Sequence, residues 1–397
     1  MSINVIKLAS PVHNKKNVEE SLKFFSDFLI NEFDAKFVDE CKENEFTVVW
    51  NMTGGTEGIF KKIYKNLRQP IIVLTTDLIN SLPAALEILS FIKSQNGKGY
   101  IIHGDLREIA CEIKKYYKFF TALKKIKEAK IASIGGASEW LIASSIDYIQ
   151  ASKKWGTSFI DIPIDELYNI LKNCHGSYDG YFDRAIEVVE PSNEDIRGVH
   201  LIYLALKKII EERKLDAISL KCFDLLKRVN NSSCLALSRL NDEGIIAGCE
   251  GDLPATFTMY LVLALTQKKS FMANPSKIDF NKNTIIFAHC TVPTTLVKQY
   301  KLRSHFESGI GVGIAGEFEK ETVTVVKIGG KNLDKIFVTT GRIISNPTND
   351  QRCRTQIEVE MDNDVREFLK NPIGNHMVIV RGNIKKELNE FMEYVGF

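Results

Sequence analysis

The chain has 397 residues, of which 44% are hydrophobic and 26% are charged, and its formal net charge at pH 7 is +2. This length and balance predict two or three folded domains and exclude a protein with long disordered regions. Lysines such as Lys124, Lys125 and Lys127 alternate with acids along the chain, which is typical of solvated helix faces and gives no indication of a nucleic-acid partner.

Cysteine and hydropathy patterns indicate the cellular compartment in which we expect the protein. None of the eight cysteines forms a CxxC pair, which argues against a zinc site made of thiolates. The start of the chain lacks the apolar core of a signal peptide, and no apolar run approaches the length of a membrane span. We therefore expect reduced thiols, a cytoplasmic location and no membrane partner.

The first predicted domain, residues 1–129, alternates short apolar runs with longer amphipathic ones. The predicted strands cover residues 45–50, 70–75 and 99–103, and the predicted helices cover residues 58–67, 81–94 and 108–129. Strands that alternate with helices indicate a parallel sheet with helices on both faces.

The second predicted domain, residues 130–272, repeats this alternation. Its predicted strands cover residues 131–134, 159–163, 217–222 and 245–249, and its predicted helices cover residues 139–151, 164–172 and 254–265, with one more inside 191–214. A second doubly wound parallel sheet is the expected result.

The third predicted domain, residues 273–397, is rich in strands with few helical signals between them. Predicted strands cover residues 284–289, 322–328, 335–345, 354–361 and 376–381. Consecutive strands without helices predict an antiparallel sheet or barrel. The expected fold is therefore α/β, with two doubly wound (Rossmann-like) parallel-sheet domains followed by a β-rich, barrel-like domain.

Two acids stand at the end of one predicted strand of the second domain. Glu250 and Asp252 follow the strand at 245–249, and ligands of open α/β sheets bind at the carboxyl ends of strands. Paired carboxylates there suit metal binding or acid–base chemistry. Asp252 equally fits the N-cap of the next helix, with Pro254 inside its first turn. Asn274 before Pro275 also follows a short predicted strand and is a common turn signal.

Histidine supplies the remaining candidates. Three of the seven histidines, His289, His305 and His376, fall in the last third of the chain. A neutral imidazole is a frequent metal ligand, although a single histidine often serves only as a hydrogen-bonding residue.

Together these segments resemble L-fucose isomerase and its relatives in the fucose/arabinose isomerase superfamily. In that family a Glu-x-Asp strand end leads into a helix, and a metal-binding aspartate ends the next strand. Asn274 follows Glu250 by 24 residues, as the family aspartate follows its glutamate. The Gly374-Asn375-His376 segment is similar to the family's Ala-Asn-His motif. The resemblance is clearest over residues 215–397.

The resemblance implies a divalent metal, usually Mn²⁺, a trimeric or hexameric assembly, and interconversion of an aldose and a ketose through an enediol. It assigns Glu250 as metal ligand and base, Asn274 to the place of the metal-binding aspartate, and His376 as the third ligand. Asp252 or a metal-bound water would be the acid. The substrate would be a small sugar, with no nucleic-acid or membrane partner.

Asn274 is the point at which this chain departs from the family pattern. An amide oxygen can bind a hard cation, but it brings no charge and takes no proton. Two alternatives therefore stay open: an isomerase of a phosphorylated or sulfonated sugar, and a sugar-binding homologue without activity. For an anionic sugar, the cations would come from Arg352 and Arg354, or from Lys298 and Lys301. Together with His289, the two arginines are the predicted substrate-binding residues.

Overall fold

A computed structural model describes residues 1–42 and 44–397 of the chain. Two compact units emerge from the contacts within it: Met1–Lys124 together with Glu390–Phe397, and Lys125–Asn389. The domain boundary that we predicted after residue 272 lies inside the second unit, so the division into three domains stays a prediction.

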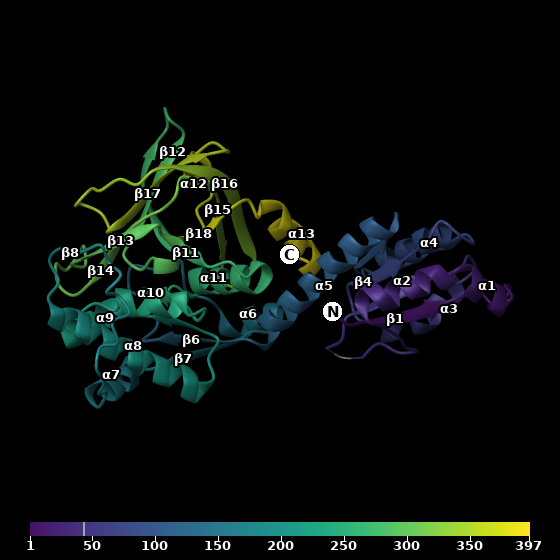
Figure 1. The fold of residues 1–397 in the computed structure, drawn as a ribbon, viewed down its shortest axis with the longest axis horizontal. Helices are drawn as coiled ribbons and strands as arrows, with labels where there is room; N and C mark the ends of the chain where they lie inside the picture. The colour runs from purple at the N-terminus through teal and green to yellow at the C-terminus, as the bar shows by residue number, and fades with distance from the viewer. Residues whose placement is uncertain (43) are drawn as a thin grey trace. The chain divides into compact units, whose positions relative to one another are not determined.

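The first unit contains a five-stranded parallel sheet (Figure 1). Its strands, in the spatial order β2-β1-β3-β4-β5, are β2 (Ala35–Phe37), β1 (Ile3–Leu8), β3 (Thr47–Asn51), β4 (Ile71–Leu74) and β5 (Gly99–Ile102). Its helices are α1 (Lys15–Ser21), α2 (Lys23–Phe33), α3 (Glu57–Ile63), the short η1 (Tyr64–Asn66), α4 (Ser81–Ser94) and α5 (Leu106–Glu128). The strand order reverses between β1 and β3, and right-handed crossovers on either side of a reversal place helices on both faces of the sheet.

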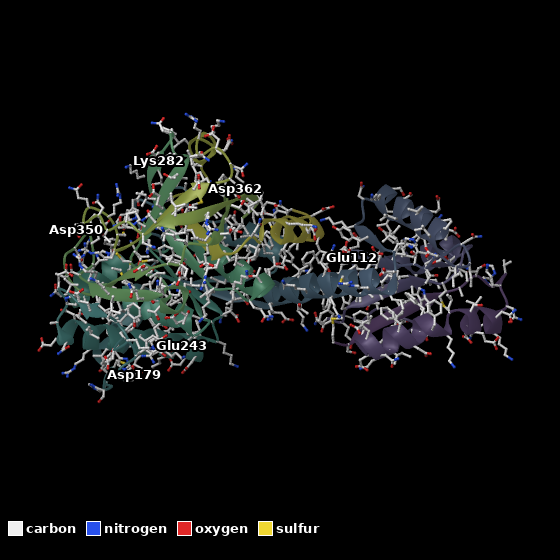
Figure 2. The ribbon with its side chains drawn as sticks, turned by 45° about the horizontal axis from the view of Figure 1, so that its top comes forward. Glu112, Asp179, Glu243, Lys282, Asp350 and Asp362 are labelled. Atoms are coloured by element: carbon white, nitrogen blue, oxygen red, sulfur yellow. The ribbon has the colours of Figure 1, made fainter. Side chains whose placement is uncertain are left out.

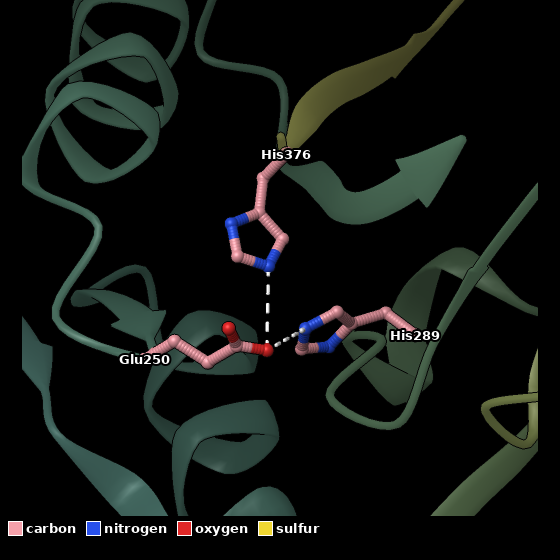
Figure 3. A group of neighbouring side chains, drawn as sticks. All are labelled: Glu250, His289 and His376. Carbon is pink, nitrogen blue, oxygen red and sulfur yellow. Dashed lines mark ion pairs between the residues drawn. The ribbon is translucent and has the colours of Figure 1, made fainter. Parts of the chain in front are cut away.

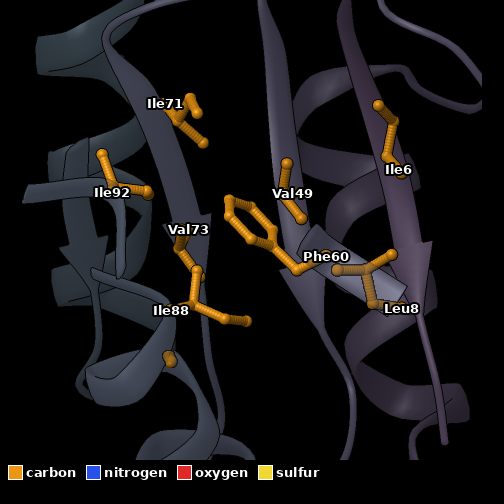
Figure 4. Packing of buried hydrophobic residues seen from close by; sticks show 9 residues of the cluster. Ile6, Leu8, Val49, Phe60, Ile71, Val73, Ile88 and Ile92 are labelled. Atoms are coloured by element: carbon orange, nitrogen blue, oxygen red, sulfur yellow. The ribbon is translucent and has the colours of Figure 1, made fainter. Parts of the chain in front are cut away.

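A continuous apolar core supports this sheet (Figure 4). Phe60 of α3 is fully buried between residues of the strands and of α4. The cluster comprises Ile6, Leu8, Val49, Phe60, Ile71, Val73, Ala85, Ile88 and Ile92. Strands buried on both faces read as continuous apolar runs, which is why β3 and β4 could be predicted.

The second unit contains a four-stranded parallel sheet in the order β10-β9-β6-β7. These strands are β10 (Ile246–Cys249), β9 (Ala217–Leu220), β6 (Lys130–Ile134) and β7 (Ser158–Ile162). Its helices are α6 (Tyr148–Trp155), α7 (Ile164–Lys172), α8 (Asn193–Arg213), α9 (Cys222–Val229), α10 (Cys234–Asp242) and α11 (Leu253–Thr266).

The helix predicted at residues 139–151 is wrong over most of its length. Gly135 and Gly136 have φ angles of 87° and 79°, and turns and irregular chain occupy the residues after them. The helix begins only after Asp147, whose side chain caps it by accepting from the Gln150 N–H at 3.0 Å.

The second unit also contains a closed antiparallel barrel (Figure 1). Its strands, in order around the barrel, are β11 (Ser270–Asp279), β12 (Thr284–His289), β17 (Thr355–Met361), β16 (Lys335–Ser345), β15 (Thr322–Gly329) and β18 (Met377–Arg381). A separate three-stranded sheet joins β14 (Gly313–Glu317), β13 (Gln299–Arg303) and β8 (Glu187–Val188). The remaining elements are η2 (Thr294–Leu296), α12 (Glu367–Lys370) and α13 (Lys385–Val395), of which α13 belongs partly to each unit.

The strand end and turn predicted at Asn274-Pro275 are also wrong. Strand β11 continues through both residues to Asp279 and shifts register between Pro275 and Lys277. Such a bulge is one of the few places where a sheet tolerates proline, because the missing N–H interrupts no regular ladder there.

Charged side chains form ion pairs in each unit, and Figure 2 labels three of the acids involved, Glu112, Asp179 and Glu243. Glu112 pairs with Lys115 at 2.8 Å in the first unit. In the second unit, Asp179 and Glu243 both pair with Arg239, at 2.7 and 3.1 Å. Over the described part of the chain, no helix combines the length and the apolar character needed to cross a membrane.

Candidate active site

Three side chains from distant parts of the sequence meet in the second unit (Figure 3). Glu250 follows β10, His289 is the last residue of β12, and His376 directly precedes β18. One ligand atom from each of the three lies within 4.8 Å of the others. The structure thus brings together Glu250 and His376, which we predicted as metal ligands, and adds His289, which we predicted as a substrate-binding residue.

A tight turn after β10 presents Glu250 to this cluster. Glu250 and Gly251 both have left-handed backbones, with φ angles of 59° and 73°. The Glu250 carbonyl accepts from the Ser138 N–H at 2.9 Å, and the Gly251 N–H donates to the Leu220 carbonyl at 3.0 Å. A Cβ atom on Gly251 would lie only 2.0 Å from the carbonyl oxygen of Gly136. The turn therefore requires glycine at position 251.

Barrel closure brings the two histidines together. Strand β11 pairs with β12 on one side and with β18 on the other. In this register Asn274 lies opposite Ala288, and Ala273 lies opposite Met377. Asn274 is therefore next in the ladder to the ends of both histidine-bearing strands. Its Oδ1 atom is buried and has no hydrogen-bond partner among the described residues.

The two oxygens of Glu250 have different neighbours. Oε1 lies 3.4 Å from His376 Nε2 and 3.9 Å from His289 Nε2. Oε2 accepts a hydrogen bond of 2.6 Å from the indole N–H of Trp140. The Glu250 side chain is only 12% exposed, whereas half of the Trp140 surface is open to solvent. Trp140 thus fixes one carboxylate oxygen and leaves the other facing the imidazoles.

A buried chain of polar groups stands behind His376. His376 Nδ1 lies 2.9 Å from Asp252 Oδ2, and Lys327 Nζ lies 3.0 Å from both oxygens of Asp252. All three side chains are fully buried. Asp252 Oδ1 also accepts from the Ala255 N–H at 2.8 Å, so this residue caps α11 as the sequence suggested. His376 Nε2 is buried without a hydrogen-bond partner among the described residues.

The electrostatics of the cluster favour two carboxylates. Burial acts to raise the pKa of Glu250, but the facing imidazoles of His289 and His376 outweigh it and hold this pKa far below its usual range. Burial likewise opposes ionisation of Asp252, but Lys327 and His376 lower the pKa of this carboxyl to about 2. Burial lowers the pKa of His289, which favours a neutral imidazole.

Two further titratable groups lie near the cluster. His305 is buried, and burial followed by the charge of His289 lowers its pKa to about 4. Partial desolvation and the charge of Glu250 raise the pKa of the exposed Glu307 carboxyl. The edge of the Phe223 ring contacts the indole of Trp140 at 5.0 Å between centroids, and Phe223 lies 5.5 Å from the His305 ring.

The cations that we considered for an anionic sugar mostly have protein partners. The guanidinium of Arg354 donates to the carbonyl and hydroxyl of Ser304 at 2.8 and 3.2 Å, and its side chain is 10% exposed. Lys301 pairs with Glu187 at 2.6 Å and Lys298 with Glu319 at 4.0 Å. Among the residues described, the Arg352 side chain has no hydrogen bond or ion pair.

Sequence reasoning missed two residues of this site, Trp140 and Lys327. A signal existed for the lysine, because Lys327 interrupts the apolar strand 322–328 at a position where a barrel strand would carry an apolar side chain. Trp140 lies in the turn that follows the strand at 131–134, which is a plausible ligand loop, but we assigned no role to its side chain.

The donor set fits a divalent metal ion. Two imidazole nitrogens and one carboxylate oxygen are ligands that Mn²⁺, Fe²⁺ and Zn²⁺ accept. The buried and unpartnered Nε2 of His376 is costly unless a ligand occupies it. Its second nitrogen faces a carboxylate, which is the usual arrangement behind a metal-binding histidine.

Comparison with known proteins points to one reaction class. No family model matches the chain. The chain is 22% identical over 272 residues to proteins named sulfoquinovose isomerase from Priestia megaterium and Priestia aryabhattai, an alignment that covers 64% of this chain and 61% of each relative. A sulfoquinovose isomerase from Alkalicoccus urumqiensis is 18% identical over 333 residues, which cover 79% of this chain and 74% of that relative.

The chain thus matches just under two thirds of the length of the two Priestia proteins. All three relatives are named as sugar isomerases, which agrees with our predicted resemblance at the level of the reaction class. The narrower resemblance to fucose and arabinose isomerases stays a prediction.

Proposed function

We propose that this protein is a metal-dependent aldose–ketose isomerase and that its substrate is an anionic, sulfonated sugar. The observation that carries the proposal is the cluster of Glu250, His289 and His376, with His376 Nε2 buried, unpartnered and 3.4 Å from Glu250 Oε1. The names of the three relatives support the sulfonated substrate.

Glu250, His289 and His376 would hold the metal, with the amide oxygen of Asn274 as a fourth candidate. A divalent ion supplies positive charge that stabilises negative charge developing on the two sugar oxygens during isomerisation. Mn²⁺ is our first choice, because the family that the sequence resembles uses it.

Glu250 is the proposed base. Isomerisation moves a proton between the first two carbons of the sugar, and a carboxylate that accepts it from one carbon can return it to the other. Trp140 holds Oε2 of Glu250 in place at 2.6 Å, so the carboxylate has a fixed direction toward the substrate. This fixed geometry reduces the cost of reaching the transition state.

The oxygens of the sugar must also exchange a proton, and we propose Glu307 for this step. Asp252, our predicted acid, is fully buried, and its oxygens already accept from Lys327, His376 and the Ala255 N–H. Glu307 is exposed, and its pKa is raised by partial desolvation and by Glu250, so it holds a proton more readily than an ordinary glutamate.

Asn274 favours a second candidate function, a sugar-binding homologue without turnover. An amide in place of the family aspartate removes one negative charge from the metal site. This candidate predicts metal and sugar binding without product.

We also propose a cytoplasmic location and a homo-oligomer, which the resemblance implies as a trimer or hexamer. The eight cysteines are free thiols, which fits a reducing compartment.

A substrate screen tests these proposals. Purified protein is incubated with sulfoquinovose, glucose 6-phosphate, L-fucose and L-arabinose, each with Mn²⁺ or with EDTA, and products are separated by chromatography. We expect Mn²⁺-dependent conversion of sulfoquinovose to its ketose and no conversion in EDTA. Conversion of neutral sugars alone would reject the anionic substrate, and binding without conversion of any sugar would support the second candidate.

Site variants test the assignments. Glu250→Gln should reduce kcat by at least 10³-fold, because it removes the base and a charged ligand with almost no change of shape. Glu307→Gln should reduce kcat by about 10²-fold. Glu319→Gln is the matched control, because among the described residues this exposed carboxylate pairs only with Lys298, at 4.0 Å. Normal turnover in Glu250→Gln would place the base elsewhere.

A further inference from the structure

Lys327 is the least expected side chain of the barrel. It projects from β15 into the protein and is fully buried, as is its partner Asp252. Among the described residues, its Nζ atom hydrogen-bonds only to the two oxygens of Asp252, both at 3.0 Å. Burial of two charges costs several kcal/mol, and well-packed apolar side chains of similar volume are often as stable or more stable.

Helix capping alone does not account for this pair. Asp252 caps α11 through Oδ1, which accepts from the Ala255 N–H at 2.8 Å. Serine, threonine or asparagine caps a helix about as well and requires no buried cation. The buried lysine therefore indicates that Asp252 has a second role besides helix capping.

This second role involves the other carboxylate oxygen, Oδ2. Oδ2 of Asp252 faces His376 Nδ1 at 2.9 Å, and the opposite nitrogen of the same ring points toward Glu250. A carboxylate only accepts hydrogen bonds, so Nδ1 must carry a proton, and the neutral form of the ring then presents the lone pair of Nε2. The segment before His376 also packs against the lysine: a Cβ atom on Gly374, whose φ is 113°, would lie 3.7 Å from Lys327 Cε.

We propose that Lys327 and Asp252 form a buried positioning pair that fixes the tautomer and orientation of His376, so that its Nε2 atom faces the candidate metal site. The inference rests on the proposed function, since it gives Nε2 a ligand to bind. Neither residue touches the substrate. Lys327 holds the carboxylate of Asp252 with both oxygens occupied, and Asp252 in turn holds the imidazole.

An amide at position 252 reverses the direction of the hydrogen bond between residue 252 and His376. The N–H of Ala255 keeps the amide oxygen at the cap, so the amide NH₂ takes the place of Oδ2 and donates to His376 Nδ1. The ring must then carry its proton on Nε2, which removes the lone pair that faces Glu250.

The decisive variant is the double substitution Asp252→Asn with Lys327→Met, which removes both charges together and leaves no unpaired buried ion. We expect a thermal midpoint close to that of the wild type, a His376 ring protonated on Nε2, and a Mn²⁺ affinity reduced by about 10- to 100-fold. Long-range ¹H–¹⁵N spectra of the metal-free protein report the tautomer, with the His376 signals identified by their loss in His376→Gln. Calorimetry reports the Mn²⁺ affinity.

Thr258→Val is the matched control. Thr258 also joins α11 to β15, because its hydroxyl accepts from the Ile328 N–H at 2.9 Å, but among the described residues it has no hydrogen bond to Asp252 or His376. We expect it to lower the thermal midpoint and to leave the tautomer and the Mn²⁺ affinity unchanged.

Two results would overturn the proposal: a double variant in which His376 keeps its proton on Nδ1, or one that binds Mn²⁺ within about threefold of wild type. Either would mean that the pair only stabilises the fold. If Lys327→Met alone does not fold, the double variant still gives the answer. If the wild type binds no Mn²⁺, the proposed function fails, while the tautomer in the metal-free protein still decides the role of the pair.

Discussion

Asn274 is a buried amide beside two imidazoles, and the substitution Asn274→Asp replaces only its NH₂ group by an oxygen. Its Oδ1 atom is buried without a partner, on the strand between those that end at His289 and begin after His376. Asn274→Asp should therefore add a negative charge to the proposed metal site and tighten Mn²⁺ binding at least tenfold, since opposite charges attract strongly where water is excluded. Titration calorimetry of the two proteins measures the change.

Asn281→Asp provides the control for that experiment. Asn281 is exposed in the loop that joins β11 to β12, so the same chemical change there should leave Mn²⁺ affinity unaltered. Equal affinities for wild type and Asn274→Asp would show that residue 274 does not face the metal.

His305 should make the stability of the protein depend on pH. Burial, followed by the charge of His289, lowers the pKa of His305 to about 4 from 6.5. The unfolded chain then binds more protons than the folded one between these values, so the stabilisation is complete above pH 6.5 and is lost as the pH falls toward 4. A shift of this size corresponds to about 3 kcal/mol.

His305→Asn isolates this contribution. Asparagine can still contact Ser308, which lies 3.0 Å from His305 Nδ1, but it does not titrate. In EDTA, urea unfolding should give a difference between wild type and variant that falls by about 3 kcal/mol from pH 7 to pH 4. A difference that is constant with pH would show that His305 titrates normally.

For single residues, the sequence was informative where a candidate site residue belongs to a short motif. Glu250 and His376 could be identified because each belongs to a short pattern, and they do lie together, although their roles stay predictions. His289 was expected to bind substrate, and neither Trp140 nor Lys327 was among the predicted site residues. Contacts between residues more than a hundred positions apart leave no local pattern, and only the fold reveals them.

Among the elements, the turn after β10 has the least tolerance for change. Gly251 has a φ of 73°, and a Cβ atom there would lie 2.0 Å from the Gly136 carbonyl. A Cβ atom on Gly244, whose φ is 84°, would have no described residue within 4 Å apart from its two chain neighbours. Gly244→Ala should cost about 1–2 kcal/mol for its left-handed backbone, and Gly251→Ala should cost a further 1–3 kcal/mol for the clash.

Urea unfolding of both variants measures these costs. Gly251→Ala should also weaken Mn²⁺ binding, because a shift of this turn moves Glu250, whereas Gly244→Ala should not. Equal losses of stability would mean that the loop at Gly136 yields easily and does not constrain the turn.

The elements that could be predicted are those that follow one regular period. The buried strands of both parallel sheets and the strands of the barrel read as apolar runs or alternations. The helix predicted at residues 139–151 was wrong because apolar residues such as Leu141 and Ile142 suit a helix, while Ser138 and Ser144 form turns instead. β1 was missed because the polar Asn4 and Lys7 interrupt its apolar run.

Two compact units make up the whole molecule, and only one of them contains the candidate site. A ligand that binds the folded state stabilises the part it binds, by about 2.7 kcal/mol at 100 times its Kd. We therefore expect Mn²⁺ to raise the thermal midpoint of Lys125–Asn389 and to leave that of Met1–Lys124 unchanged in scanning calorimetry.

Phe60→Leu assigns the transitions in that experiment. Phe60 is fully buried in the core of the first unit, so its truncation should lower only the transition that Mn²⁺ leaves unchanged. A variant that lowers both transitions equally would show that the two units unfold as one.

Closure of the barrel also has a consequence for the order of events during synthesis. β18 pairs with β11 and with β15, and His376 enters the cluster only when those pairings form. While the ribosome is still making β15 and β16, the nascent chain already contains Glu250 and His289 but lacks the second imidazole. Uptake of the proposed metal would then have to wait for β18, so the rate of barrel closure would set the fastest rate at which a newly made molecule could bind it.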